Sequence, residues 1–145
     1  MEVRSARRFH FDAEPAEVWA ALASVEQYPQ WWPWLQSFEA QGLVQGDRWR
    51  CTVKPPLPYV VRFSVHLDEV IAEQSIRATV AGDIAGQAQL SLEPADDGST
   101  MILLSKLTPA SPTLKVMGTI GRPLVRYGHD WVLDAGAGQF ASRAL

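Results

Sequence analysis

Hydrophobic and polar residues alternate along most of this chain, which is the pattern of β-strands with one buried face. The first alternating stretch runs from Val3 to Phe11. Six further strands are expected within residues 35–44, 48–53, 59–70, 75–81, 88–92 and 100–107. Turn signals such as Asp96-Asp97-Gly98 separate several of them, so the sequence predicts an antiparallel sheet.

The segment after the first strand predicts two short helices. Pro15 suits the first helical position, and an amphipathic helix is expected from Pro15 to Ser24. The stretch Tyr28-Pro29-Gln30-Trp31-Trp32-Pro33-Trp34 follows it closely. Its prolines allow at most one further helical turn, and its four aromatic rings need contact with a larger element.

The C-terminal third, Pro112 to Leu145, predicts one long amphipathic helix or two short helices in line. At about 100° per residue, its inward stripe is Met117, Ile120, Leu124, Tyr127, Gly128, Trp131, Ala135 and Gly138. Four apolar residues lie outside this stripe, namely Val125, Val132, Leu133 and Phe140, which indicates cover on more than one side. Each glycine costs about 1 kcal/mol against alanine, so either packing holds the helix or it breaks near Gly121.

Seven strands with an apolar face need a cover, and the C-terminal helix is the predicted element long enough to supply it. The sequence therefore predicts an α+β fold in which a curved seven-stranded antiparallel sheet wraps around this helix. No repeat, linker or low-complexity segment interrupts the pattern. Residues 1–145 are expected to form a single domain.

Composition and charge narrow the possible function classes. The chain has 145 residues, of which 47% are hydrophobic and 20% charged, as in soluble globular proteins. A net charge of −3 without a basic patch disfavours nucleic-acid binding. No apolar run approaches the length of a membrane span, and the start of the chain lacks the apolar core of a secretory signal. Cys51, the single cysteine, is expected to be a buried, inert thiol, and its lack of a partner favours the cytoplasm.

Side chains able to do chemistry are few. His10 and His66 are expected on the outward faces of their strands. His129 lies on the flank of the long helix, where a structural hydrogen bond or a contact with a ligand would explain it. Because adjacent helix residues do not face each other, no pair between His129 and Asp130 is expected. Asp83, between two glycines, fits either a turn residue or a group that reaches the helix or a ligand.

Known metal and cofactor motifs are absent from the sequence. No histidines or cysteines stand at metal-ligand spacing, so no metal site is expected. There is no phosphate-binding glycine loop and no Gly-x-Ser-x-Gly nucleophile elbow, and no cofactor is predicted. If the protein is an enzyme, its weak acid/base candidates are His129, Asp83 and Tyr127.

The element order and several local motifs resemble a known family. The motifs are Phe11-Asp12-Ala13-Glu14-Pro15-Ala16-Glu17-Val18-Trp19, Tyr28-Pro29-Gln30-Trp31-Trp32-Pro33, Gly82-Asp83-Ile84-Ala85-Gly86 and Gly128-His129-Asp130-Trp131-Val132-Leu133. With the order of elements, they resemble the START-like (SRPBCC, helix-grip) superfamily, the polyketide cyclase/dehydrase and lipid transport group. The resemblance implies an apolar cavity between sheet and helix. Its members bind lipids, sterols, polyketides, hormones or quinones, and a minority are enzymes whose catalytic residues vary.

The resulting expectation is a protein that binds a hydrophobic small molecule, such as a lipid, a polyketide or another aromatic or isoprenoid compound, in this cavity. The expected ligand-binding residues are Trp32, Trp49, Phe63, Val65, Val80, Leu90, Leu124, Tyr127, Gly128 and Trp131. One alternative is a cyclase or dehydratase-like enzyme acting in the same cavity. A second is a protein-interaction module that docks through the Trp31–Trp34 patch. Gly128 leaves space beside it for a side chain from the sheet or for a bound molecule.

Overall fold

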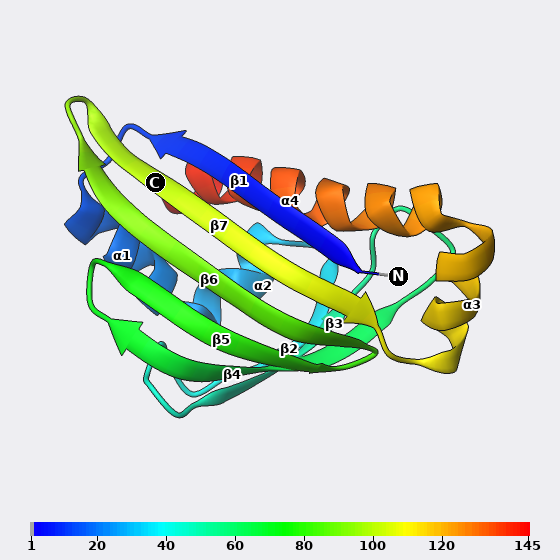
Figure 1. Cartoon of the computed structure of the whole chain (residues 1–145). Coiled ribbons are helices and arrows are strands. Elements are labelled where there is room, and N and C mark those ends of the chain that lie inside the picture. The colour runs from blue at the N-terminus through cyan, green and yellow to red at the C-terminus, as the bar shows by residue number, and fades with distance from the viewer. Residues whose placement is uncertain (1) are drawn as a thin grey trace.

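A computed structural model describes residues 2–145, apart from the side chains of residues 117–120, 122 and 124. One seven-stranded antiparallel sheet with the order β1-β7-β6-β5-β4-β3-β2 curves around the helices (Figure 1). Its strands are β1 (Val3–Phe11), β2 (Leu35–Glu39), β3 (Arg48–Val53), β4 (Val61–Ile71), β5 (Ser75–Gly82), β6 (Ile84–Ala95) and β7 (Gly98–Pro109). The predicted α+β architecture, with its curved seven-stranded sheet, is confirmed.

The helices lie on one side of this sheet. The short elements α1 (Pro15–Ala23), η1 (Val25–Gln27) and α2 (Tyr28–Trp31) follow β1, and α3 (Pro112–Ile120) and α4 (Arg122–Ala144) follow β7. Figure 1 shows α4 running along the sheet, with α3 at its N-terminal end and α1 and α2 nearer its C-terminal end. Among the described residues, no helix combines the length and apolar character that a bilayer crossing requires.

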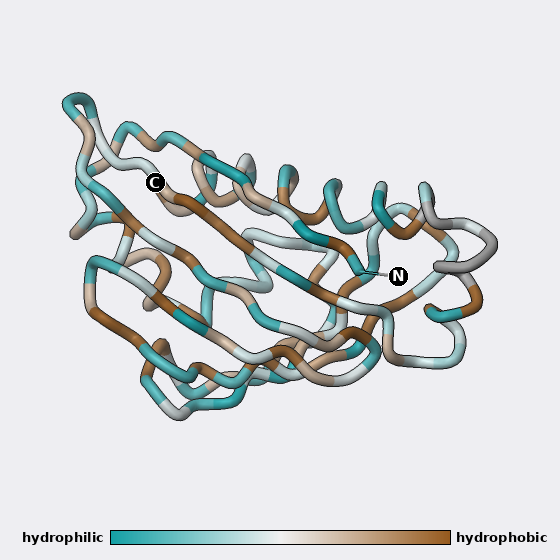
Figure 2. Tube along the Cα trace, viewed as in Figure 1, coloured by the Kyte–Doolittle hydropathy of each residue, from teal (hydrophilic) through white to brown (hydrophobic). Residues whose placement is uncertain are grey.

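The alternation of the sequence separates the two faces of the sheet, and Figure 2 shows hydrophobic and hydrophilic positions following one another along the strands. On β1, Val3, Ser5 and Phe11 are buried, whereas Arg4 and Ala6 are exposed. Because successive strand residues point to opposite faces, the buried positions share the face that is turned toward α4.

The strand predicted over residues 35–44 is shorter in the structure. β2 stops at Glu39. Beyond it, the carboxylate of Asp47 accepts hydrogen bonds from the backbone N–H groups of Gln41 and Gly42, at 3.0 and 3.1 Å. These bonds hold the segment against Asp47 and satisfy the N–H groups of Gln41 and Gly42 without a strand partner.

The C-terminal helix breaks at Gly121, which is one of the alternatives that its glycines predict. Gly121 takes φ −123° and ψ 48°, outside the helical region. Because of the break, α4 does not continue the helical turn of α3. The inward stripe predicted for one continuous helix is therefore wrong in part. Tyr127, expected inward, is 55% exposed. The apolar residues of α4 that are buried or half-buried include Val125, Gly128, Val132, Leu133, Gly136 and Phe140.

Aromatic rings fill the space between sheet and helices at one end, termed here the filled end. At its centre, the ring of Tyr28 lies 4.7–5.7 Å, centroid to centroid, from those of Trp31, Trp32, Phe38 and Trp49. Phe140 of α4 closes this cluster through contacts with Phe11 and Trp31 at 5.4 and 5.5 Å. Such ring pairs add stability beyond that gained from the apolar area they bury. Together the rings fill this end of the space with side chains.

The tryptophans after α2 are anchored to α4. Trp32 Nε1 donates to the carbonyl of Gly136 at 2.9 Å, and Trp34 Nε1 donates to Gln139 Oε1 at 2.8 Å. Trp31 is only 7% exposed. The Trp31–Trp34 segment therefore fastens α4 to the filled end, which disfavours its use as a free docking patch.

Candidate functional site: a cavity between the sheet and α4

The other end of the same space, termed here the hollow end, holds a cavity of about 280 Å³. The sheet lines it with Val3, Val53, Val61, Phe63, Val65, Val80, Ile84, Ala88, Leu103, Ser105, Leu107, Thr108 and Pro109. The helices contribute Leu114, Val125, Gly128, His129, Val132 and Leu133, and the β3–β4 loop contributes Pro55 and Tyr59. Among these described lining residues, the polar side chains are those of Tyr59, Ser105, Thr108 and His129.

The β3–β4 loop closes against α4 beside the cavity. A Cβ added at Gly128 would come within 2.1 Å of the Tyr59 hydroxyl and 3.0 Å of Leu57 Cδ1. Lys54 Nζ donates to the carbonyls of Pro55 and Leu57, which holds the proline-rich loop in place. The space beside Gly128 is therefore occupied by a side chain, as one of the two alternatives predicted, but that side chain is Tyr59 of the β3–β4 loop and not a residue of the sheet.

His129 reaches the cavity from α4 and is hydrogen-bonded to its neighbour in the chain. Its Nδ1 lies 3.2 Å from Asp130 Oδ1, so the expectation that these residues form no pair is wrong. The reason is that Asp130 turns toward β1, where Arg7 Nη2 lies 3.1 Å from the same oxygen. Arg126 Nε, one helical turn away, is 3.4 Å from Asp130 Oδ2. The carboxylate is thus fixed by two cations and by the imidazole.

Burial and neighbouring charges set the protonation of this pair. Burial lowers the pKa of His129, against the opposing hydrogen bond and charge of Asp130. Partial burial pushes the pKa of Asp130 upward, but the hydrogen bond from His129 and the charges of Arg126 and Arg7 outweigh it and lower this pKa. The imidazole is then neutral, donates from Nδ1 and keeps a lone pair on Nε2. His129 Nε2 is buried without a hydrogen-bond partner among the residues that the structure describes.

The residues expected to bind a ligand divide between the two ends of the fold. Those that line the cavity are Phe63, Val65, Val80 and Gly128. Those that pack at the filled end are Trp32, Trp49, Leu90 and Trp131. Tyr127, also a candidate for proton transfer, is exposed, and the side chain of Leu124 lies outside the described residues.

Asp83 has a structural place at the corner between β5 and β6. Its Oδ2 accepts the backbone N–H of Arg62 at 2.8 Å, and its carbonyl accepts the N–H groups of Ala110 and Ser111 at 2.7 and 3.1 Å. These bonds tie the turn to β4 and to the segment before α3. Asp83 is outside the described cavity lining, so His129 is the acid/base candidate that the structure places at the cavity.

Three of the four described polar lining residues, Tyr59, Ser105 and Thr108, were not predicted from the sequence. Ser105 could have been found, because it stands between Leu103 and Leu107 on the inward face of an alternating strand. Tyr59 gave no comparable signal. It follows a proline-rich loop without periodicity, and its contact with Gly128 joins positions far apart in the sequence.

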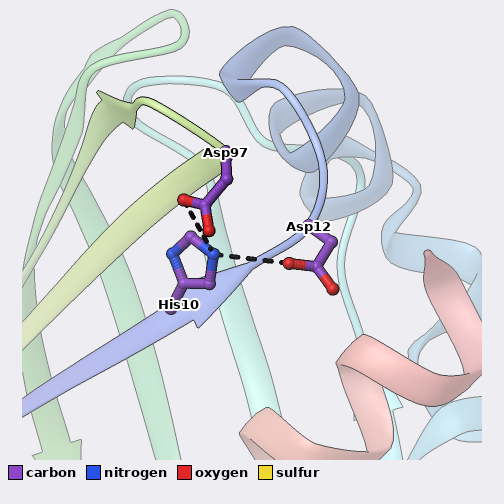
Figure 3. A group of neighbouring side chains, drawn as sticks. All are labelled: His10, Asp12 and Asp97. Atoms are coloured by element: carbon purple, nitrogen blue, oxygen red, sulfur yellow. Dashed lines mark ion pairs between the residues drawn. The ribbon is translucent and has the colours of Figure 1, made fainter.

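A separate group of ionisable side chains lies on the surface where β1 meets the β6–β7 turn (Figure 3). His10 Nε2 lies 3.4 Å from carboxylate oxygens of both Asp12 and Asp97. The side chains are 43%, 93% and 79% exposed, in that order of residues. Because all three stand in solvent, we assign them as surface ion pairs, whose energies are usually small.

The chain is similar to a known protein family over nearly its whole length. The family model for "Polyketide cyclase / dehydrase and lipid transport" matches residues 2–144. No curated protein matches the chain.

Among solved structures, the chain is similar to the Zhui aromatase/cyclase from Streptomyces sp. R1128, with a TM-score of 0.80, 14% sequence identity, and 99% of this chain and 94% of that chain covered. It is also similar to a START superfamily protein from Mycobacterium smegmatis, with a TM-score of 0.73, 14% identity, and coverage of 97% and 96%. The di-domain ARO/CYC StfQ from the steffimycin biosynthetic pathway gives 0.66 and 11% identity, covering 99% of this chain and 52% of that one. Identities this low establish a shared fold alone. The family match over nearly the whole chain goes further and shows that this protein belongs to the polyketide cyclase/dehydrase and lipid transport family.

Proposed function

We propose that this protein binds a hydrophobic small molecule in the cavity at its hollow end. The observation that carries the proposal is the cavity of about 280 Å³, walled mostly by apolar side chains while the opposite end of the same space is filled by aromatic rings. Concave sites with apolar walls and a few polar groups are the usual places for such ligands. The family description, which includes lipid transport, supports the same class of ligand.

The size of the cavity narrows the class of ligand further. About 280 Å³ lies at the lower edge of ligand pockets, which span roughly 300–1,000 Å³. The space suits a compact molecule, such as a bicyclic aromatic, a short polyketide or an isoprenoid, better than a long-chain lipid. Its walls come from several strands and from α4, and the cavity is partly open to solvent.

Native mass spectrometry of the purified protein tests this function, followed by extraction and identification of whatever remains bound. The expected result is a discrete mass addition from a hydrophobic compound, or uptake of an added compact hydrophobe such as 2-methoxynaphthalene. A protein that carries no bound molecule and takes up no added hydrophobe at its solubility limit would contradict the proposal.

A second candidate is proton transfer in the same cavity, and the pair of His129 and Asp130 favours it. A buried neutral imidazole, oriented by a carboxylate at 3.2 Å, is the arrangement that a general base requires. The aromatase/cyclase among the similar structures supports a polyketide-type substrate for this candidate. Asp83 and Tyr127 would take no part, because the first is bonded to a backbone N–H and the second is exposed.

Exchange of the α-protons of 1-tetralone in heavy water, followed by proton NMR, tests this second candidate. If His129 acts as a base, the wild-type protein accelerates the exchange and His129→Phe does not, although both still bind the ketone. Equal exchange rates in the two proteins would rule out proton transfer by His129.

A further inference from the structure

Four buried side-chain atoms have no hydrogen-bond partner in the described part of the chain, and all four lie where β1, β7 and α4 meet. One of them, Arg7 Nε, is 3.7 Å from Asp134 Oδ1, and the other three belong to Ser5, Ser105 and His129. Ser5 lies directly opposite Ser105 in the β1–β7 register. Neither hydroxyl oxygen has a hydrogen-bond partner in the described part of the chain, and the same holds for His129 Nε2. Ser105 and His129 line the cavity, and Ser5 stands beside Ser105 at the cross-strand distance of about 5 Å between Cβ atoms. These three residues are termed the polar wall.

The polar wall needs an explanation, because buried polar side chains nearly always find a partner. Most neighbouring inward positions are apolar, with Val3 beside Ser5 on β1 and Leu103 and Leu107 on either side of Ser105. The exception is Arg7, which follows Ser5 on the same face of β1 and pairs with Asp130. An alanine or valine at either serine would avoid the cost of an unpaired hydroxyl. A bound molecule that supplies hydrogen bonds would satisfy Ser105 and His129, which line the cavity, and Ser5, directly opposite Ser105, can bond to its hydroxyl.

The chemistry of the polar wall discriminates between ligands. Asp130 accepts the hydrogen bond from Nδ1 of His129, so Nε2 offers a lone pair, and each serine hydroxyl can donate or accept. A ligand hydroxyl could donate to Nε2 and accept from a serine at the same time. A carboxylate has no hydrogen to donate, so it would face that lone pair with its own and leave Nε2 unpaired.

We propose that the ligand carries a hydroxyl group, whether phenol, enol or alcohol, that the polar wall binds, and that the wall selects against carboxylic acids. This inference rests on the proposed binding function and specifies its ligand class. All three atoms are buried in the free protein, so binding includes rotation of a serine side chain about χ1 to another staggered position and a shift of the groups that cover His129 Nε2. Apolar walls then supply affinity, and the polar wall supplies orientation and selectivity.

Isothermal titration calorimetry at pH 7.5 with three matched probes tests the inference. The probes are 2-naphthol, 2-methoxynaphthalene and 2-naphthoate, which share a ring system and differ in the group offered to the polar wall. One added hydrogen bond to an otherwise unpaired group predicts that 2-naphthol binds about fivefold to tenfold more tightly than the methoxy compound. The carboxylate is expected to bind more weakly than either.

Two variants test which residues produce the preference for 2-naphthol. His129→Phe keeps a ring but loses Nε2, and Ser105→Ala removes one hydroxyl. Each should reduce the preference for 2-naphthol while 2-methoxynaphthalene still binds. Ser91→Ala, on the outward face of β6 with Gln89, is the matched control and should keep the wild-type preference.

Failures of the two proposals are distinguishable. Equal affinity for all three probes, or tighter binding of 2-naphthoate, would overturn the role of the polar wall while leaving hydrophobe binding in place. A wild-type preference that survives in both His129→Phe and Ser105→Ala would overturn it as well. No binding of any probe would overturn the proposed function and this inference together.

Discussion

The hydroxyl of Tyr59 lies against the backbone of Gly128, so any side chain at position 128 would have to displace the Tyr59 ring. A Cβ at residue 128 would stand 2.1 Å from the Tyr59 oxygen. Alanine normally stabilises a helix relative to glycine, but here overpacking should dominate. We expect Gly128→Ala to lower the free energy of unfolding by about 1–3 kcal/mol in urea denaturation.

Two controls distinguish the effect of the contact with Tyr59 from the effect of glycine on the stability of the helix. In a Tyr59→Phe background, the same substitution should cost less, because the nearest remaining atoms are at 3.0 and 3.2 Å. Gly138→Ala, in the same helix, meets nothing within 4 Å in the described structure, and should stabilise the protein by about 0.5–1 kcal/mol. If Gly128→Ala and Gly138→Ala were equally stabilising, the contact with Tyr59 would not exist.

The pair of His129 and Asp130 predicts a pH dependence of stability. Burial lowers the pKa of His129 in the folded state, so between this value and the ordinary value near 6.5 the unfolded chain binds more protons. The stabilisation is fully present above about pH 6.5 and is lost as the pH falls toward the folded pKa. Urea midpoints measured from pH 7.5 to 5 should therefore decrease.

His129→Phe removes the titrating imidazole and should flatten the profile in that range. Asp130, whose pKa is lowered by His129, Arg126 and Arg7 against the effect of burial, contributes a separate loss at lower pH, as the carboxylate protonates. An identical slope between pH 7.5 and 5 in wild type and His129→Phe would show that His129 is not the group responsible.

Local pattern was sufficient to predict the sheet, because each strand shows its own alternation. β1 has the predicted bounds, Val3–Phe11, and α1 ends at Ala23, one residue before the predicted end at Ser24. β2 was predicted too long, since the hydrogen bonds from Asp47 that shorten it join residues outside any repeating pattern.

The cavity could be predicted only in part. Phe63, Val65 and Val80 follow from strand parity, which puts them on the face toward α4. The face of α4 did not follow, because Gly121 interrupts the helix and shifts its phase. Nor can a sequence pattern show which end of the space is filled, since Trp32 is held by Gly136 and Trp49 packs against Tyr28, both from segments distant in the sequence.

The anchoring of Trp32 to α4 predicts that stability and ligand binding can be separated. Trp32→Phe loses the hydrogen bond to the carbonyl of Gly136 and part of the ring packing at the filled end. We expect a loss of about 1–3 kcal/mol in stability, with little change in the affinity for a hydrophobic probe. A large loss of affinity in a folded Trp32→Phe protein would place the ligand at the filled end instead.

Cys51 provides a probe of unfolding. Burial raises the pKa of its thiol to about 12, so the reactive thiolate is scarce and shielded at neutral pH. Reaction with Ellman's reagent should therefore follow the fraction of unfolded protein as urea is added. Rapid labelling of the native protein without denaturant would contradict the buried position.

The most direct test of the central claim, that the ligand occupies the cavity at the hollow end, is a titration of 2-methoxynaphthalene into three proteins by calorimetry. Ala88 lines the cavity, and Gln89 is exposed on the opposite face of the same strand. We predict that Ala88→Phe fills the cavity and weakens binding by about tenfold or more, whereas Gln89→Phe binds as the wild type does. Unchanged affinity in a folded Ala88→Phe protein would contradict the assignment of the cavity as the binding site.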